Sequence, residues 1–108
     1  MKILAGIMVV LVLLGLGACR KNDIRTVVIR TPEMKNAACA KIVQDALARQ
    51  PGIVSVRPDF QTRELTVTYN SMVVARKNLE FTVAGAGFDA DDTLAVSNAV
   101  ANLPSECR

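Results

Sequence analysis

Three cysteines, Cys19, Cys39 and Cys107, are the residues of this 108-residue chain whose type and spacing could do chemistry. The chain contains no histidine. This excludes His-dependent catalytic triads, His general bases and most catalytic zinc sites. Any metal ion must therefore be held by sulfur, carboxylate or amide groups, and thiolates favour soft ions such as Cu(I).

Cys19 ends a segment that has the order of a secretory signal: a short positive start, an apolar run over residues 3–16, and small residues before the Cys. The sequence Leu16-Gly17-Ala18-Cys19 resembles the lipobox of bacterial lipoproteins, in which the signal is cut before a Cys that becomes lipid-modified. The alternative, an uncleaved membrane helix, falls short of the ~20 apolar residues needed to span the hydrocarbon. We therefore expect a lipoprotein anchored to a membrane of the cell envelope, facing the periplasm or the cell exterior.

Cys39 and Cys107 are the two thiols that remain once Cys19 carries lipid. In an oxidising compartment two thiols pair with each other, bind a metal ion or stay exposed. Cysteine counting alone leaves these alternatives open.

The charge of the mature chain does not indicate a nucleic-acid partner. Removing Lys2 with the signal reduces the 13 basic residues to 12, against 10 acidic residues, so the net charge is +2. The basic residues are scattered, whereas a nucleic-acid footprint needs a basic patch. Residues 19–108 are enough for one small domain with a modest core.

The apolar patterns predict elements in the order β-α-β-β-α-β. Residues 25–30 are apolar on both faces, as in a central strand, and Asn36 is a good N-cap for a helix over 37–50. Pro58 makes the next strand, 53–59, an edge strand. The remaining predicted elements are a strand at 64–69, a helix at 73–85 and a short fourth strand at 88–92.

This order predicts an α+β fold, the ferredoxin-like βαββαβ sandwich, with two helices on one face of a four-stranded antiparallel sheet. We expect a signal peptide at 1–18, a tether at 19–24, the folded domain at 25–92 and a tail at 93–108. In the tail, a short helix over 93–102 precedes a loose end at 103–108. Such a topology hosts many functions and identifies none.

The segment Met34-Lys35-Asn36-Ala37-Ala38-Cys39 resembles the metal loop of the heavy-metal-associated (HMA) domain, the module of copper chaperones, copper-pump amino-terminal domains and periplasmic mercury-binding proteins. That loop reads Met-x-Cys-x-x-Cys. The resemblance covers about residues 25–92 and continues in register at Pro51-Gly52-Ile53, Thr66-Val67-Thr68-Tyr69 and Ala86-Gly87-Phe88-Asp89-Ala90. It implies a non-enzymatic protein that binds Cu(I) or Hg(II) and passes the ion to a thiol-bearing partner.

Asn36 stands where the loop of this family has its first Cys, so only Cys39 of the pair is present. A single thiolate loses the chelate effect, and an amide oxygen is a hard, weak ligand for a soft ion. The tail Leu103-Pro104-Ser105-Glu106-Cys107 resembles the tails of small exported relatives, which end in Leu-Pro and closely spaced Cys. If the tail folds back over the loop, Cys39 and Cys107 could meet.

Three hypotheses follow for this pair. Cys39 and Cys107 could form a two-thiolate metal site in a monomer, with a metal-bridged dimer through Cys39 as a variant. They could instead form a structural disulfide, or the chain could be a degenerate interaction module without metal. Met34 is expected to fill the core. The resemblance implies that Phe88 lies beside the loop and shields it from water, and the alternative is that Phe88 is simply a core residue. The run Asp89, Asp91 and Asp92 is expected to be a solvated turn.

Overall fold

The computed structural model describes residues 22–108. The elements are β1 (Ile24–Arg30), α2 (Ala37–Ala48), β2 (Ile53–Asp59), β3 (Glu64–Asn70), α3 (Arg76–Gly85), α4 (Ser97–Ala101) and the 3-10 turn η1 (Ser105–Cys107). The predicted signal peptide and Cys19 lie outside the described residues. Within the described part, no helix is long and apolar enough to cross a bilayer.

The sheet has three antiparallel strands in the order β1-β3-β2. Val67 at the centre of β3 is paired with Val27 on one side and Val56 on the other. The predicted edge position of β2 is confirmed. The prediction that β1 is central is wrong, because the strand that would cover its outer edge is missing.

The predicted fourth strand at 88–92 does not form, and only an isolated bridge between Ala90 and Thr93 is present there. The segment nevertheless reaches β1: the Asp91 N–H donates to the Arg30 carbonyl, and the Arg30 N–H donates to Asp91 Oδ1, both at 2.9 Å. Asp91 has a φ of 50°, which turns the chain away from the sheet. A carboxylate therefore accepts the hydrogen bond that a strand carbonyl would accept, and the ladder stops after one residue.

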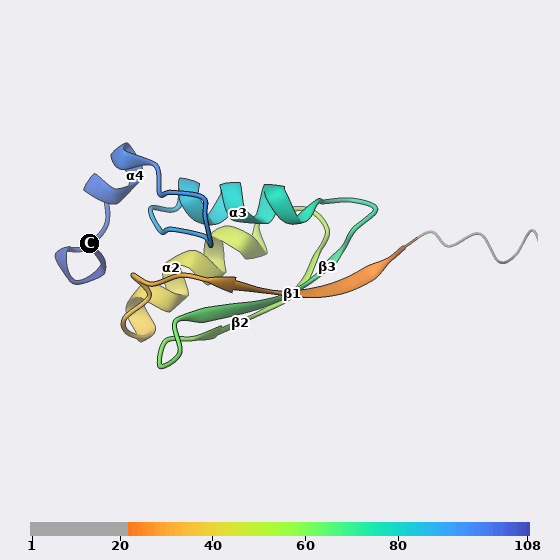
Figure 1. Cartoon of the computed structure of the whole chain (residues 1–108), viewed down its shortest axis with the longest axis horizontal. Coiled ribbons are helices and arrows are strands. Elements are labelled where there is room, and N and C mark those ends of the chain that lie inside the picture. The colour runs from red at the N-terminus through yellow and green to blue at the C-terminus, as the bar shows by residue number, and fades with distance from the viewer. Residues whose placement is uncertain (1–21) are drawn as a thin grey trace, which may run out of the picture.

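Helices α2 and α3 cover one face of the sheet (Figure 1). The core between these layers contains Ala40, Val43 and Leu47 of α2, as their helical spacing predicts. Helix α3 begins at Arg76 rather than Val73, because the Val73 and Val74 N–H groups close a turn onto the Asn70 carbonyl.

The C-terminal tail is ordered against the domain, so the prediction of a loose end is wrong. Helix α4 is shorter than predicted, but Leu103 and Cys107 beyond it are both buried. Figure 1 shows the tail at the end of the molecule opposite to the start of β1. This places the last residues near the start of α2.

Candidate functional site

The loop between β1 and α2 is held by hydrogen bonds at both ends. The Thr31 N–H donates to the Arg63 carbonyl at 2.8 Å, and the Arg63 guanidinium donates to the Pro32 carbonyl at 3.1 Å. The Met34 N–H donates back to the Thr31 carbonyl, and the Met34 side chain is fully buried. Met34 thus fills the core, as expected, and the loop has a fixed path into α2.

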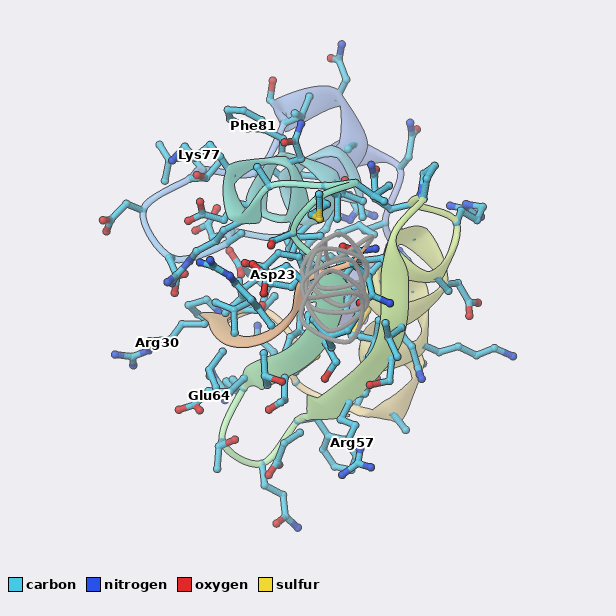
Figure 2. The ribbon with its side chains drawn as sticks, turned by 90° about the vertical axis from the view of Figure 1, so that its right-hand side faces the viewer. Asp23, Arg30, Arg57, Glu64, Lys77 and Phe81 are labelled. Atoms are coloured by element: carbon cyan, nitrogen blue, oxygen red, sulfur yellow. A yellow bond between two sulfur atoms is a disulfide. The ribbon has the colours of Figure 1, made fainter. Side chains whose placement is uncertain are left out.

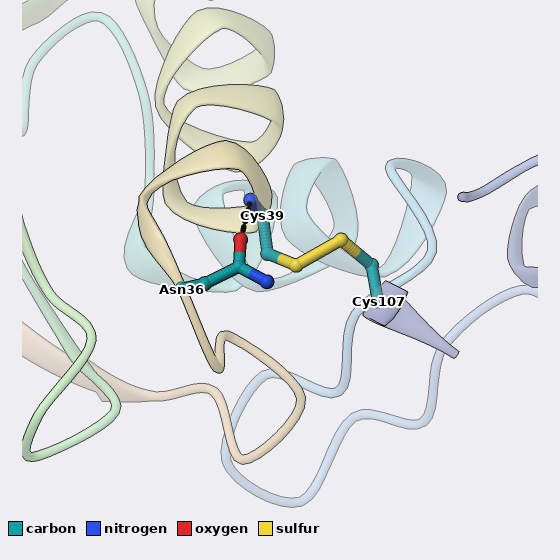
Figure 3. Close-up of a disulfide and its surroundings, with 3 residues drawn as sticks. All are labelled: Asn36, Cys39 and Cys107. Atoms are coloured by element: carbon teal, nitrogen blue, oxygen red, sulfur yellow. Dashed lines mark hydrogen bonds between the residues drawn. A yellow bond between two sulfur atoms is a disulfide. The ribbon is translucent and has the colours of Figure 1, made fainter. Parts of the chain in front are cut away.

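Asn36 is the N-cap of α2, as predicted. Its backbone is extended, with φ −148° and ψ 176°, and its Oδ1 accepts a hydrogen bond from the Cys39 N–H at 3.0 Å (Figure 3). This satisfies one of the N–H groups that a helix start leaves without a partner. The side chain that replaces the first Cys of the HMA loop therefore bonds to the backbone of the second.

Cys39 lies in the first turn of α2, and its sulfur is joined in a disulfide to the sulfur of Cys107 (Figure 3). The two Cα atoms are 5.7 Å apart, although 68 positions separate them in the sequence. Both cysteines are fully buried. The tail therefore reaches the loop, which was the condition for the two sulfurs to act together.

Gly87 and Leu103 set the path of the tail to Cys39. Gly87 has a φ of 102°, and a Cβ built on it would lie 2.8 Å from Leu103 Cδ1. The Val96 N–H donates to the Ala84 carbonyl, which ties the chain before α4 to the end of α3. Turn η1 then brings Cys107 to the loop, with its N–H bonded to the Pro104 carbonyl at 2.9 Å.

Phe88 is fully buried in the core cluster that also contains Met34, Cys39 and Cys107. It follows Gly87 directly, so the residue that turns the chain toward the tail also delivers this ring to the core. Its burial among these residues agrees with the expected position beside the loop.

Glu33 and Asp89 form a carboxyl pair next to the disulfide that sequence reasoning did not find. The Asp89 N–H donates to Glu33 Oε2 at 3.2 Å, and Asp89 Oδ1 accepts from the Ala95 N–H at 2.7 Å. Burial raises the pKa of Glu33, and the hydrogen bond and charge of the Asp89 carboxyl raise it further. Both residues line a hollow of about 430 Å³ that also touches Cys107. No sequence signal could have paired them, because 56 positions separate them.

The rest of the acidic run behaves as a turn. Asp91 bonds to β1 and forms an ion pair with Arg76 at 3.2 Å. Among residues 22–108 there is no cluster of three or more Cys, Asp or Glu side chains that could hold a metal ion.

The model of the heavy-metal-associated domain family matches residues 25–89, which is more than half of the chain. The chain belongs to this family. Solved structures agree with the match. Oxidized MerP from Ralstonia metallidurans CH34 is 28% identical with a TM-score of 0.62, over 64% of this chain and 96% of that one. No curated protein matches.

Two further HMA structures extend the comparison. The mercury-bound form of MerP, the periplasmic protein of a bacterial mercury detoxification system, is 30% identical with a TM-score of 0.57, over 64% of this chain and 96% of that one. The CopZ metallochaperone is 20% identical with a TM-score of 0.59, over 61% and 98%, and supports the fold alone. The predicted family and the ferredoxin-like class of fold are thus confirmed, with three strands in place of four.

Proposed function

We propose that this HMA protein binds one soft heavy-metal ion, Cu(I) or Hg(II), through the thiolates of Cys39 and Cys107 in its reduced state. The observation that supports this proposal most is the position of Cys107. The Cα atoms of Cys39 and Cys107 are 5.7 Å apart, so the tail supplies a second sulfur beside the loop. In the Met-x-Cys-x-x-Cys pattern that this loop resembles, both sulfurs come from the loop itself.

The chemistry follows from the two oxidation states of the pair. Adding two electrons and two protons to the disulfide gives two thiols, and a metal ion then displaces the protons. In the disulfide form neither sulfur is available as a thiolate ligand.

The cellular setting is part of the proposal. Lipid on Cys19 would hold the mature chain at a membrane of the cell envelope, facing the periplasm or the exterior. The partner would be a thiol-bearing protein at the same membrane, which could reduce the disulfide or exchange the metal ion. In this proposal the protein is not an enzyme, and it binds the metal ion as a monomer.

A competitive Cu(I) titration of the fully reduced full-length protein, read by native mass spectrometry, tests the proposal. We expect one Cu(I) per monomer, held against a competing chelator and lost in both Cys39→Ser and Cys107→Ser. The double variant Asn36→Cys/Cys107→Ser restores the loop pattern of the family and should bind again. Unchanged affinity in Cys107→Ser would overturn the two-sulfur site, and one Cu(I) per dimer in that variant would point to Cys39 bridging two copies.

A second candidate function is an interaction module whose Cys39–Cys107 disulfide is purely structural. The complete burial of both cysteines in the core favours it. The same titration separates the two, because a structural disulfide predicts no competitive Cu(I) binding by the reduced wild-type protein.

A further inference from the structure

Four exposed apolar side chains gather at the end of the molecule where the N-terminal segment enters β1. They come from three segments: Ile24 starts β1, Val54 lies near the start of β2, and Met72 and Val73 follow β3. Their exposed fractions are 50%, 60%, 62% and 58%. We call these four residues the entry patch. Four large apolar side chains exposed at one end of a small domain indicate that this end contacts another molecule or a membrane.

Hydrogen bonds and strand register bring these residues together. Ile24 is the register partner of Asn70, the last residue of β3. The Asn70 N–H donates to the Gly52 carbonyl at 2.8 Å, two residues before Val54. A Cβ built on Gly52 would lie 2.9 Å from the Val73 Cβ. The backbones of the entry patch therefore lie together at one end of the sheet, although its members are up to 49 positions apart in the sequence.

The turn that carries Met72 and Val73 has its backbone donors satisfied internally. The N–H groups of residues 71–74 donate to the Asp23 carbonyl, to Asn70 Oδ1 and to the Asn70 carbonyl, at 2.8 to 3.1 Å. The Asp23 carboxylate at this end is paired with Arg25 at 2.9 Å and accepts from the Ser71 hydroxyl at 2.7 Å. Moving this turn toward the membrane interface would thus leave none of these N–H donors without a partner.

The length of chain between the proposed lipid site and β1 determines what covers the patch. From Cys19 to Ile24 is five residues, which reach at most about 18 Å when fully extended. Figure 2 looks onto the end of the molecule at which β1 begins, with Asp23 near the centre of the view. A chain anchored at Cys19 therefore keeps Ile24 within about 18 Å of its lipid attachment site.

We propose that the entry patch inserts into the interfacial layer of the membrane that anchors the protein, and so fixes the orientation of the domain. This inference rests on the proposed lipid anchor. Interfacial apolar groups enter about 5–10 Å into the headgroup and acyl boundary, and Arg20 and Lys21 in the tether complement anionic headgroups. Because the Cys39–Cys107 pair is at the other end of the domain (Figure 1), this orientation presents it to partners away from the bilayer.

Single-tryptophan variants test the orientation, because the chain contains no tryptophan. Met72→Trp places the probe in the entry patch. Leu94→Trp is the matched control, since Leu94 is 77% exposed and lines the same hollow as Cys107. Each lipidated mature variant, beginning at Cys19, is reconstituted into phosphatidylethanolamine and phosphatidylglycerol vesicles with brominated acyl chains. We expect a blue-shifted Met72→Trp emission and several-fold stronger quenching than for Leu94→Trp.

Equal quenching of the two probes would overturn the inference. So would a blue shift of the Met72→Trp emission that increases with protein concentration and is not accompanied by quenching by the brominated lipid. The second result would indicate that a second copy of the chain covers the patch. Flotation of the wild-type protein with vesicles and the mass of its N-terminal peptide test the anchor separately. A floating, lipidated protein with unquenched Met72→Trp contradicts this inference alone, whereas an unmodified Cys19 contradicts both it and the anchor.

Discussion

At the scale of single residues, Asn36 shows how one position can exchange a metal ligand for a structural bond. Its amide oxygen accepts from the Cys39 N–H at 3.0 Å and caps α2. Asn is among the best N-cap residues, whereas a thiol is only a weak hydrogen-bond acceptor. The substitution therefore removes a soft ligand from the loop and strengthens the start of the helix that carries Cys39.

Asn36→Ala should lower the free energy of unfolding by about 1 kcal/mol, because the Cys39 N–H loses its partner. Urea unfolding of the oxidised protein measures the change. Asn36→Asp keeps an oxygen acceptor and is the control, with an expected stability close to that of the wild type. Equal stability of the Ala and Asp variants would contradict the capping role.

Glu33 makes the stability of the domain depend on pH. Its pKa in the folded protein lies above the ordinary value of 4.5, so the fold favours the protonated carboxyl. The stabilisation from Glu33 is therefore fully present below about pH 4.5 and is lost as the pH rises through the folded pKa. Glu33→Gln keeps a neutral side chain at every pH, so its stability relative to the wild type should rise as the pH increases above about 4.5. Parallel curves for the two proteins in urea unfolding would show that Glu33 is not the cause.

At the scale of elements, the C-terminal tail is the part that distinguishes this chain from a bare ferredoxin-like sandwich. It begins where the fourth strand fails, passes through α4 and returns to the loop before α2. Gly87 is the residue on which this path depends most, because its φ of 102° is one that residues with a Cβ rarely adopt.

Gly87→Ala should destabilise the protein by about 2 kcal/mol, through backbone strain and the contact of the new Cβ with Leu103. It should also lower the fraction of protein in which Cys39 and Cys107 are paired, counted by alkylation of free thiols. Gly85→Ala is the control, because a Cβ added at Gly85 would have nothing within 4 Å and the helix favours Ala. A Gly87→Ala variant as stable and as fully paired as Gly85→Ala would contradict this account of the tail.

The elements that the sequence predicted well are those with a local signal. Helix α2 has a cap at Asn36 and an apolar stripe, and β3 alternates strictly between buried and partly exposed residues. The missing strand was not predictable in this way. The fourth strand fails because Asp91 adopts a positive φ. Asp adopts this conformation in some sequences only, so the residue type alone did not predict it.

The candidate site was only partly predictable for the same reason. Sequence reasoning selected Cys39 and Cys107 and left their relation open, because their contact closes a 68-residue separation that no periodicity encodes. The burial of Leu103, which docks the tail, depends on space above Gly87 that only the folded chain defines. The Glu33–Asp89 pair also forms only through tertiary contacts, so it could not be predicted from the sequence.

At the scale of the whole molecule, the described domain has two chemically different ends. One carries the C-terminal tail with the Cys39–Cys107 pair, and the other carries the start of β1 with the entry patch. The disulfide joins Cys39 to Cys107 across 68 positions of the sequence. In a domain of this size, its contribution is a large share of the free energy of unfolding.

Reduction of the disulfide should lower the free energy of unfolding by about 4 kcal/mol, the chain-entropy value for a loop of this length. Urea unfolding of the wild-type protein with and without reductant measures it. Cys107→Ser should unfold at the midpoint of the reduced wild type and should not respond to reductant. A reductant effect of equal size in Cys107→Ser would show that the disulfide is not the origin of the stability.

The most direct test of the account is the number of sulfur atoms bound to the metal ion, measured by X-ray absorption on the reduced protein loaded with one equivalent of Cu(I). We predict two sulfur ligands in the wild-type monomer and the loss of this coordination in Cys107→Ser. A metal site with one sulfur and nitrogen or oxygen ligands in the wild type, unchanged by Cys107→Ser, would contradict the proposal that the tail supplies the missing thiolate.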